Sequence, residues 1–507
     1  MSDAPAARKG DAVSVAPAAR KGDAVSVAPA AGLTGRMTVL TAEKCRALYE
    51  AALTVIAEVG MTVPQEEARR LLLEAGASVE GDELVRIPRE LVAQARRTVP
   101  SSVRVYDRAG ELAMDLGGRN AYFGTGSDLM NTYDLETGER RLSVLADVAR
   151  MARLCDGLPN IDFVMSSAYP HDVEARAAYL ESFRAMVTNT TKPMVMTAEG
   201  VEDLEVMWRI AGLLRGGPEE LREKPYFIQY GEPVSPLMHP VEVLDKLLFC
   251  ADWGIPLVYA PAPIAGATSP VTHAGQIAQG TAESLFGLVI HQLRRPGAPF
   301  IFGSASGKLD MVTLQTLYNA AERYTTDLGI IEMAKWLDLP NWNFAGTSDS
   351  QCVDTQAGID ATEVTLLSMQ AGSNLNHDIG YLDFGLTCAP EMVVIVDEII
   401  SMNRRALEGI AVDEETLAAE VIAAAGPGGD FLRSRHTRRH ARELQWRPTL
   451  FNRVTRAHWE ADGAPDLREK ARRKALDILA AHTPEPLAEE LASVVDRLVD
   501  DFAGRER

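Results

Sequence analysis

Long apolar stretches and paired cysteines are both missing from this chain. No part of the sequence approaches the ~20 consecutive apolar residues that a membrane-spanning helix needs. The 507 residues include only five cysteines, and none of them lies in a CxxC spacing, which argues against a disulfide framework or a thiolate metal site. The N-terminus also lacks the apolar core of a secretory signal. We therefore expect a cytoplasmic protein that does not bind a membrane.

Positive charge is scarce as well. The chain has 51 Lys and Arg against 71 Asp and Glu, so its formal net charge is -20. A surface of this sign repels phosphate backbones and anionic lipid headgroups, so nucleic acid is not an expected partner. With 46% hydrophobic and 24% charged residues, the composition is that of a globular protein with one large domain and appendages.

The first residues contain a tandem duplication. Residues 4–15 (APAARKGDAVSV) recur without change at 16–27 and consist mostly of Ala, Pro, Gly and polar residues. A unit of twelve residues copied once cannot build a solenoid. Its composition is typical of disorder, so we expect residues 1–36 to form a disordered tail.

The folded part is predicted to begin with helices. Apolar residues recur at steps of three and four from Thr41, and β-like stretches follow around Val103 and Leu112, which predicts an N-terminal helical and β extension over 37–118. Eight short apolar runs come next, with amphipathic helical patterns between them. The runs start at Ala121, Ile161, Pro193, Tyr226, Pro256, Pro299, Asn341 and Ser373.

Eight strand–helix units in a row predict a particular α/β fold. A closed (β/α)8 TIM barrel fits this count better than an open doubly wound sheet, which usually has about five or six strands. We expect the barrel to span 119–388 and a C-terminal helical extension to span 389–507. Nearly every run ends in Gly, Ser, Thr, Asp or Glu, where barrel enzymes place their catalytic loops.

Two motifs have more than one interpretation. GTGSD at 124–128 follows a strand but lacks the third Gly of a dinucleotide fingerprint and the Lys of a P-loop. It indicates either a close approach of backbone to a small ligand or a tight turn that needs positive φ. His436 and His440 would share one face of a helix and could hold a metal. Because five arginines surround them, we expect a solvated basic helix or a docking surface for an acidic group, and no metal.

Aromatic and polar residues gather at the ends of the predicted strands. The rings either fill the barrel or surround a cation; they are Tyr230, Tyr259, Trp342, Phe344 and Tyr381. The polar candidates at these ends are Glu199, Glu232, Asp349, His377 and Asp378. A single carboxylate at a strand end is often a helix cap, but several on one rim favour a site.

Four ordered segments together resemble a known family. They are YFGTGSDLMNTYDLETGERR, GTSDSQCVDTQAG, AGSNLNHDIGYLDFG, and GGDFLRSRHTRRH followed by WRPTLFNR. Over about Met37 to the C-terminus, the chain is similar to the corrinoid-dependent trimethylamine methyltransferase family. The resemblance implies a (β/α)8 barrel that moves a methyl group from a methylated amine to the Co(I) of a separate corrinoid protein.

The branch of the family follows from a missing residue. Members that act on trimethylamine carry pyrrolysine in the barrel, and this sequence has none; Gln351 in the GTSDSQ loop is expected near that place. The chain thus resembles the branch without pyrrolysine, whose best-known member demethylates glycine betaine. A quaternary ammonium already has a neutral tertiary amine as its leaving group, so Co(I) can displace it without an activating residue.

The resemblance implies roles for nine residues. Asp349 and Gln351 are the catalytic candidates. The substrate-binding candidates are His377, Tyr230, Tyr259, Phe344, Tyr381, Glu232 and Asp378. The rings would hold the ammonium group, and donors such as His377 or an arginine would pair with a carboxylate. The corrinoid is expected to arrive with a partner protein, with no tightly bound cofactor, and the chain is expected to form a homo-oligomer.

Three alternatives remain open. The methyl donor could be another amine, such as trimethylamine, proline betaine or carnitine. The chain could be a barrel aldolase or lyase that uses Glu199, Glu232 or Asp349 as a base. A lysine able to form a Schiff base would favour this chemistry, but the only lysines near strand ends are Lys192, before the third run, and Lys308, after the sixth. It could also bind quaternary amines without turnover.

Overall fold

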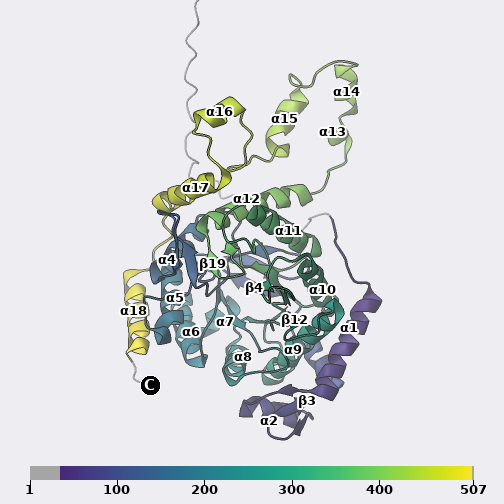
Figure 1. Cartoon of the computed structure of the whole chain (residues 1–507), viewed down its shortest axis with the longest axis vertical. Coiled ribbons are helices and arrows are strands. Elements are labelled where there is room, and N and C mark those ends of the chain that lie inside the picture. Colours follow the sequence, from purple (N-terminus) through teal and green to yellow (C-terminus); the bar gives the residue numbers. More distant parts are fainter. Residues whose placement is uncertain (1–34, 505–507) are drawn as a thin grey trace, which may run out of the picture.

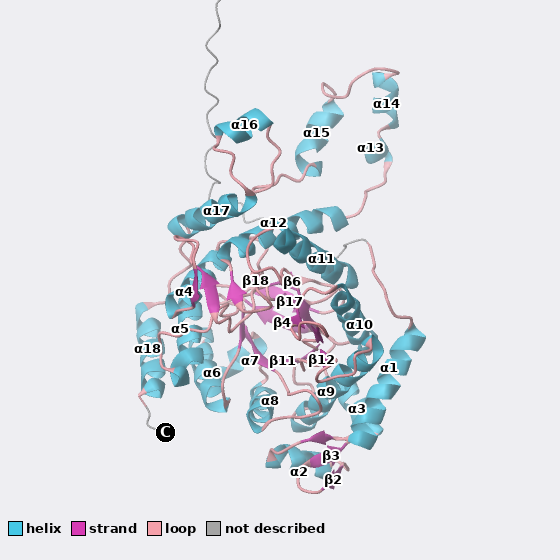
Figure 2. Ribbon diagram, in the orientation of Figure 1, coloured by secondary structure: helices cyan, strands magenta, loops and turns pink. Residues whose placement is uncertain are grey.

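The computed structural model describes residues 35–504, in which helices surround a curled parallel sheet (Figure 1). The predicted disordered tail lies outside the described residues, apart from Gly35 and Arg36. Figure 2 shows most strands gathered at the centre of the molecule with helices outside them, while a small separate group of strands lies at the lower edge. The predicted α/β class is confirmed by this arrangement.

Seven strands form the central sheet, and each pairs in parallel with its neighbours. Their order is β6 (Tyr122–Phe123), β17 (Leu375–His377), β16 (Asn341–Phe344), β13 (Phe300–Gly303), β11 (Leu257–Tyr259), β10 (Phe227–Gly231) and β9 (Met194–Met196). Seven of the eight predicted apolar runs therefore become strands. Every strand is short and buried, as expected where helices cover the outer face of a parallel sheet.

The second predicted run, from Ile161, is not a regular strand. It contacts both edge strands through single parallel bridges, Gly124 with Phe163 on one side and Val164 with Met194 on the other. The Thr125 hydroxyl donates to the Met165 carbonyl (3.1 Å) and accepts from the Met165 amide (2.8 Å). At Met165 a side chain thus takes the place of backbone partners, whereas Val164 still bonds through its backbone to Pro193 and Val195, so the run pairs with its neighbours only at single positions.

One helix follows each of the eight runs along the chain. These helices are α4 (Leu145–Asp156), α5 (Ala178–Asn189), α6 (Val201–Arg215), α8 (Val241–Trp253), α9 (His273–Arg294), α10 (Ala321–Leu337), α11 (Thr355–Ala371) and α12 (Pro390–Leu407). The 3-10 turn η2 (Ala175–Ala177) precedes α5, and the short α7 (Pro218–Glu223) follows α6. The main hydrophobic core lies between these helices and the outer face of the sheet.

The N-terminal extension lies against α9 and closes the amino-terminal end of the sheet. It consists of α1 (Ala42–Thr54), η1 (Val55–Val59), β1 (Met61–Thr62), α2 (Glu66–Glu74), β2 (Ser78–Glu80), β3 (Leu84–Arg86), α3 (Arg89–Thr98), β4 (Val103–Tyr106) and β5 (Leu112–Leu116). The β4–β5 hairpin buries Val105 and Met114 in a second core with Ile228 and Val258 from the inner face of the sheet. This end of the sheet is therefore filled with apolar side chains.

Loops at the carboxyl ends of the strands form two small sheets. One is ordered β12 (Ile264–Ala265), β14 (Gly307–Leu309), β15 (Thr316–Leu317). The other is ordered β18 (Tyr381–Leu382), β19 (Thr387–Cys388), β7 (Asn131–Tyr133), β8 (Arg140–Leu142). They make a rim around the end of the sheet where parallel α/β folds place their sites.

The C-terminal helices divide into two groups. α17 (Leu467–Ala481) packs on α12 and α4, and α18 (Glu489–Ala503) packs on α5 and α6. In contrast, α13 (Glu414–Leu417), α14 (Ala419–Ala425), α15 (Arg435–Leu444) and α16 (Arg456–Ala461) stand away from the body (Figure 1). Within residues 35–504, no helix is both long and apolar enough to cross a membrane.

Candidate active site

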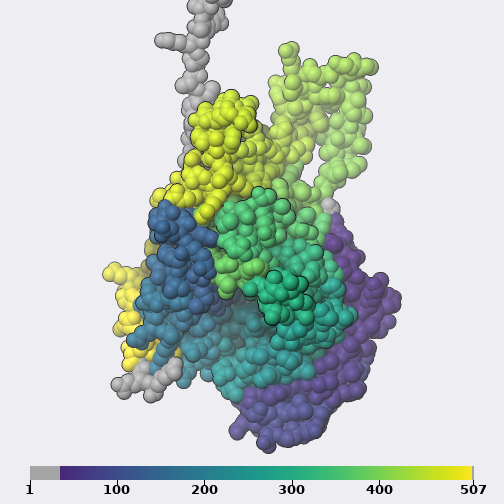
Figure 3. Space-filling view, viewed as in Figure 1, coloured from purple at the N-terminus to yellow at the C-terminus, as the bar shows by residue number. Residues whose placement is uncertain are grey.

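A cavity of about 390 Å³ lies at the carboxyl ends of the strands, inside the rim. Its wall comes from β10, β16 and β17, from Tyr381 at the start of β18, and from the loops that carry Asp128 and Tyr318. Figure 3 shows the hollow in the face turned toward the reader. A volume of this size suits a small organic molecule.

One wall of the cavity is aromatic. Because successive side chains of a strand point to opposite faces, Trp342 and Phe344 on β16 both face the interior. The Trp342 ring is stacked on the His377 ring with centroids 3.9 Å apart, and the Phe344 centroid lies 4.6 Å from His377 on β17. Tyr230 on β10 extends the wall, with its centroid 5.6 Å from that of Trp342. Four rings from three strands thus form a continuous surface.

His377 is held in a fixed orientation by its neighbour. Its Nδ1 lies 2.6 Å from Oδ1 of Asp378, and both side chains are buried. Its Nε2 is buried and has no hydrogen-bond partner among the described residues. Since His377 lines the cavity, Nε2 is the atom through which this ring can bind a polar ligand.

Three carboxylates face the same cavity, those of Asp128, Glu232 and Asp378. Burial raises the pKa of Asp128 to about 6, although the Ser127 hydroxyl donates to it at 3.0 Å. Burial also raises the pKa of Glu232, and the charges of the other two carboxylates add to this effect. Burial keeps the pKa of Tyr230 well above its usual value, so its phenol donates to Glu232. A cation in the cavity would relieve the repulsion among these groups.

The GTGSD motif packs the cavity floor tightly. A Cβ on Gly126 would lie 2.2 Å from Oδ1 of Asp378 and 2.3 Å from the Tyr381 hydroxyl oxygen, which itself donates to the Ser127 carbonyl. Neither Gly124 nor Gly126 has positive φ, whereas Asp128 has φ 64°. The turn interpretation was therefore wrong for the glycines. The close approach is real, but the backbone approaches side chains of the protein itself.

Arg323 is the one cationic residue among those that line the described cavity. It comes from the first turn of α10, and its side chain is 1% exposed. Its Cζ lies 3.7 Å from the Phe344 centroid and 4.9 Å from that of Tyr318, whose carbonyl accepts a hydrogen bond from Nη1. Its Nε is 3.5 Å from the Asp327 carboxylate, and burial raises the pKa of Asp327 to about 6. The cavity therefore has an acidic, aromatic part and a separate guanidinium.

A sequence model described as trimethylamine methyltransferase (MTTB) matches residues 8–506. The chain belongs to the trimethylamine methyltransferase family. Relatives include trimethylamine methyltransferase MttB of Desulfitobacterium hafniense (strain DSM 10664 / DCB-2), which is 31% identical over 90% of this chain and 92% of the relative. MttB of Methanosarcina thermophila is 32% identical over 89% and 94%. The glycine betaine methyltransferase of Desulfitobacterium hafniense (strain Y51) is 28% identical over 90% and 96%.

Solved structures resemble this family member only distantly. The monomethylamine methyltransferase MtmB of Methanosarcina barkeri has a TM-score of 0.44 and 11% identity, over 88% of this chain and 96% of that one. The family relationship therefore depends on the sequence comparisons alone.

The structure brings six of the nine predicted site residues of this family member to the cavity. They are Tyr230, Glu232, Phe344, His377, Asp378 and Tyr381. Tyr259 lies elsewhere, because Val258 takes the inward position on β11 and Tyr259 points outward to α9. There its hydroxyl lies 2.6 Å from Nδ1 of His239. Alternation along the strand is known from the sequence, but which of two neighbours faces inward is set by the pairing of the strands.

The two catalytic candidates also lie outside the cavity lining. Asp349 accepts hydrogen bonds from the backbone amides of Tyr318 (2.9 Å) and Asn319 (2.8 Å), so it fixes the loop that carries Tyr318. Gln351 is exposed, its carbonyl accepts from the Tyr133 hydroxyl at 2.6 Å, and its amide lies 3.3 Å from the Asp349 carbonyl. The loop leads both side chains away from the rings.

Other sequence candidates of this family member also lie outside the cavity lining. Glu199 is exposed and does not line the cavity. Lys192 donates to three backbone carbonyls at 2.6 Å, and Lys308 donates to Gln276 at 2.6 Å. No group of three potential metal ligands occurs in the described part of the chain.

Sequence reasoning missed Arg323, Tyr318 and Asp128. Arg323 lies in a helix rather than at a strand end, and Tyr318 lies in the loop that precedes that helix. Asp128 belongs to the GTGSD motif, whose glycines favoured a tight turn or a close backbone approach to a ligand. An acidic residue in the loop after a strand was the signal that could have pointed to Asp128.

Proposed function

We propose that this chain transfers a methyl group from a quaternary amine, with glycine betaine as the leading substrate, to the Co(I) of a corrinoid carried by a partner protein. The observation that supports this proposal is the division of the cavity into an acidic, aromatic part and one buried guanidinium. Glycine betaine has the matching division into a trimethylammonium group and a carboxylate. Membership in a family of methyltransferases supports the reaction type.

The proposal includes closure of the sheet into a (β/α)8 barrel. The segment around Phe163 and Val164 bridges β6 on one side and β9 on the other, which are the two edges of the seven-stranded sheet. Eight helices follow the eight segments in order. A closed barrel would hold Tyr230, Trp342 and His377 in fixed positions around one axis.

The ammonium end of the substrate is assigned to the rings and carboxylates. A ring face within about 6 Å of a cation contributes roughly 0.5 to 2 kcal/mol. Tyr230, Trp342 and Phe344 line the cavity together with Glu232 and Asp378. A quaternary ammonium has no N–H to donate, so rings and negative charge are the two means by which a protein recognises it.

The carboxylate end is assigned to Arg323, with His377 Nε2 as a second donor. A guanidinium pairs with a carboxylate through two parallel hydrogen bonds. The Asp327 carboxylate, 3.5 Å from Nε of Arg323, and the Tyr318 carbonyl, which accepts a hydrogen bond from Nη1, orient the guanidinium at the cavity wall. The buried position of Arg323 strengthens this attraction compared with a surface arginine.

The proposed reaction requires little acid–base catalysis from this chain. A corrinoid carried by the partner would supply Co(I) as the nucleophile and would end as methyl-Co(III), while the electron pair of the broken N–CH3 bond would stay on nitrogen and a neutral tertiary amine would leave. The residues of this chain hold the substrate so that one methyl group faces the mouth of the cavity, which is catalysis by positioning. The roles predicted for Asp349 and Gln351 are not part of this proposal, because neither side chain lines the cavity.

The test is a methyl-transfer assay with a reduced corrinoid carrier protein. The cobalt spectrum is followed with glycine betaine, proline betaine, carnitine, tetramethylammonium and trimethylamine as separate donors. We expect glycine betaine to give the fastest change and trimethylamine to give none. Transfer from trimethylamine but from no betaine would overturn the substrate assignment, and transfer from none of the five would overturn the proposed reaction.

A further inference from the structure

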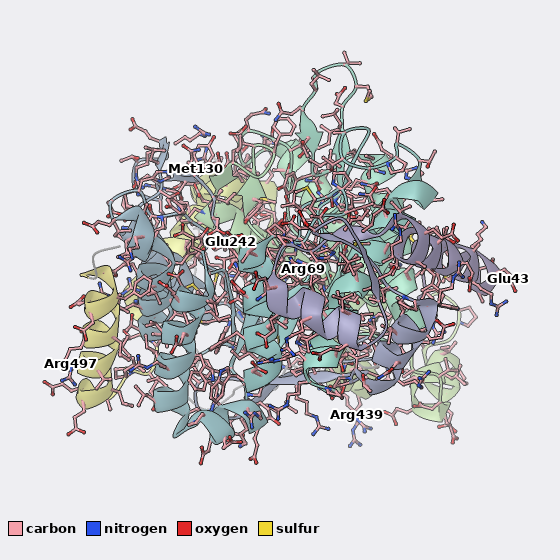
Figure 4. The ribbon with its side chains drawn as sticks, turned by 90° about the horizontal axis from the view of Figure 1, so that it is seen from below. Glu43, Arg69, Met130, Glu242, Arg439 and Arg497 are labelled. Atoms are coloured by element: carbon pink, nitrogen blue, oxygen red, sulfur yellow. The ribbon has the colours of Figure 1, made fainter. Side chains whose placement is uncertain are left out.

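A second cavity, of about 480 Å³, lies at the opposite end of the central sheet from the candidate active site. Its wall includes strand β4 and the prolines that lead into β10, β11 and β13, which are Pro225, Pro256 and Pro299. No described residue lines both cavities. In Figure 4 the rim lies toward the top of the view, where Met130 is labelled, and the amino-terminal ends of the strands lie toward the bottom. The second cavity is therefore separate from the proposed substrate site.

Three arginines line this second cavity, and they come from three separate elements. Arg104 lies on β4, Arg222 lies on α7, and Arg295 lies directly after α9. Among the described residues of the lining, the one acidic side chain is Glu223, so three Arg against one Glu leave a net charge of +2. The chain as a whole has a formal net charge of -20. Because a cleft lined by one sign of charge focuses the electric field, this cavity attracts anions in a protein that otherwise repels them.

Two of these arginines have no carboxylate partner within residues 35–504. The side chain of Arg104 forms no hydrogen bond or ion pair there, although Asp115 on β5 is its cross-strand neighbour. Nη1 of Arg295 donates to the Asp252 carbonyl at 2.7 Å, while the Asp252 carboxylate pairs with Arg294 at 2.5 Å. Both guanidiniums therefore keep their charge for a ligand.

Contacts with a neighbouring loop hold Arg222 at the second cavity. Its Nε donates to the Trp253 carbonyl at 3.3 Å, and a Cβ on Gly254 would lie 2.9 Å from its Cγ. Glycine at this position, with φ 70°, thus lets the arginine lie against the loop. Its ion partner Glu219, at 2.9 Å, is 71% exposed, and a pair that water screens is weak. An anion with more charge can therefore compete with this glutamate for Arg222.

The chemistry of the lining favours a phosphate over a single carboxylate. A guanidinium binds phosphate through two parallel hydrogen bonds, and a phosphate monoester offers three terminal oxygens and up to two negative charges. A single carboxylate has two oxygens and one charge, which are too few for three arginines. Lys224 adds a further cation, because its Nζ lies 5.5 Å from the centroid of Tyr106, whose ring lines the cavity. A cavity of this volume also has room for a small organic group beside the phosphate.

We propose that the second cavity binds a small phosphorylated molecule through Arg104, Arg222 and Arg295. The bound phosphate bridges β4 to the segments that precede β10 and β13, so binding stabilises the amino-terminal end of the sheet. This inference does not depend on the proposed methyl transfer, because the two cavities share no described residue.

Titration calorimetry on the full chain tests the inference. The probes are inorganic phosphate, ribose 5-phosphate, citrate and ribose, each in chloride buffer of the same ionic strength. We expect both phosphates to bind and ribose not to bind. Arg104→Gln should weaken the affinity for both phosphates at least tenfold and leave the fold intact, because its side chain has no partner within residues 35–504. Arg222→Lys and Arg295→Lys keep the charge but lose the paired donors, so each should weaken it severalfold.

A matched control separates the second cavity from general charge effects. Arg209→Gln removes an exposed arginine on α6 outside the cavity, and it should leave both affinities unchanged. Absence of binding by either phosphate would overturn the inference. Wild-type affinity in all three cavity variants would also overturn it, because the phosphate would then lie elsewhere, such as at Arg323. Binding of citrate but of neither phosphate would overturn the assignment to a phosphorylated ligand.

Discussion

In the cavity, His377 and Asp378 lie 2.6 Å apart and their side chains are 8% and 5% exposed. On the projecting segment 409–461, which carries α13 to α16 and is here called the arm, His440 and Glu415 lie 3.1 Å apart and the glutamate is 49% exposed. Both pairs join a ring nitrogen to a carboxylate. The cavity pair is shielded from water and fixes a ring beside two other rings, while water screens the arm pair. Similar pairs of residues thus orient a binding group in one region and join two short helices in the other.

The arginines of the two regions differ in the same way. The Arg323 side chain is 1% exposed and lies between two rings, and the Arg439 side chain is 67% exposed. A buried guanidinium keeps a strong field over a short distance, so it can recognise one carboxylate. The guanidiniums of α15 are exposed to water, so dissolved salt should screen their attraction to other charges.

The largest difference in activity between variants of the cavity and variants of the arm is expected when their arginines are substituted. Arg323→Lys should lower kcat/KM for glycine betaine about 100-fold, because lysine keeps the charge but loses the planar pair of donors, and one lost hydrogen bond to a buried carboxylate costs up to about 3 kcal/mol. Activity with tetramethylammonium, which has no carboxylate, should fall much less. Arg439→Lys on the arm should leave both activities unchanged. An equal loss for both substrates in Arg323→Lys would show that Arg323 supports the fold and does not select the carboxylate.

A smaller difference in activity is expected when the histidines of the two regions are substituted. His377→Ala should lower kcat/KM for glycine betaine about 30-fold, since a hydrogen bond to a charged group contributes about 2 kcal/mol. His377→Gln keeps an amide donor and should recover part of the loss, with most of the change in KM. His440→Ala is the matched variant on the arm and should change neither constant. Unchanged kinetics in His377→Ala would remove this residue from the site.

The smallest expected effect is a pH dependence. Burial raises the pKa of Asp128 to about 6, so the carboxyl of the free protein becomes protonated as pH falls through that value. A cationic group binds best to the ionised form, so affinity for glycine betaine should rise about tenfold from about pH 5 to pH 7 and then level off. Titration calorimetry measures this, and Asp128→Asn should flatten the curve.

Two further variants define this pH effect. Burial also raises the pKa of Glu232, so a shallower slope should remain in Asp128→Asn and disappear when Glu232→Gln is added. Glu443→Gln on α15 changes an exposed carboxylate and should leave the wild-type curve unchanged. A slope that persists in the double variant would assign the titration to another group.

Much of the fold was predictable because apolar runs and helical patterns alternate along the chain. Seven of the eight runs are strands, and the helices follow in the expected order. The run from Ile161 was predicted as a strand because it is apolar, but at Met165 both backbone groups bond to the hydroxyl of Thr125 and not to a neighbouring strand. Hydrogen bonds between distant segments cannot be read from the composition of either one.

The sequence by itself determined the family, the α/β class and the set of polar and aromatic residues at strand ends, because these depend on local pattern and residue order. Only the tertiary structure decided which of them meet. In the structure, Tyr230 faces the cavity and Tyr259 faces α9. Asp349 holds a loop by accepting hydrogen bonds from its backbone, and Arg323, which comes from a helix, lies over the Phe344 ring. The physical reason is that the register of neighbouring strands, and the packing of helices on them, set the direction of every side chain at once.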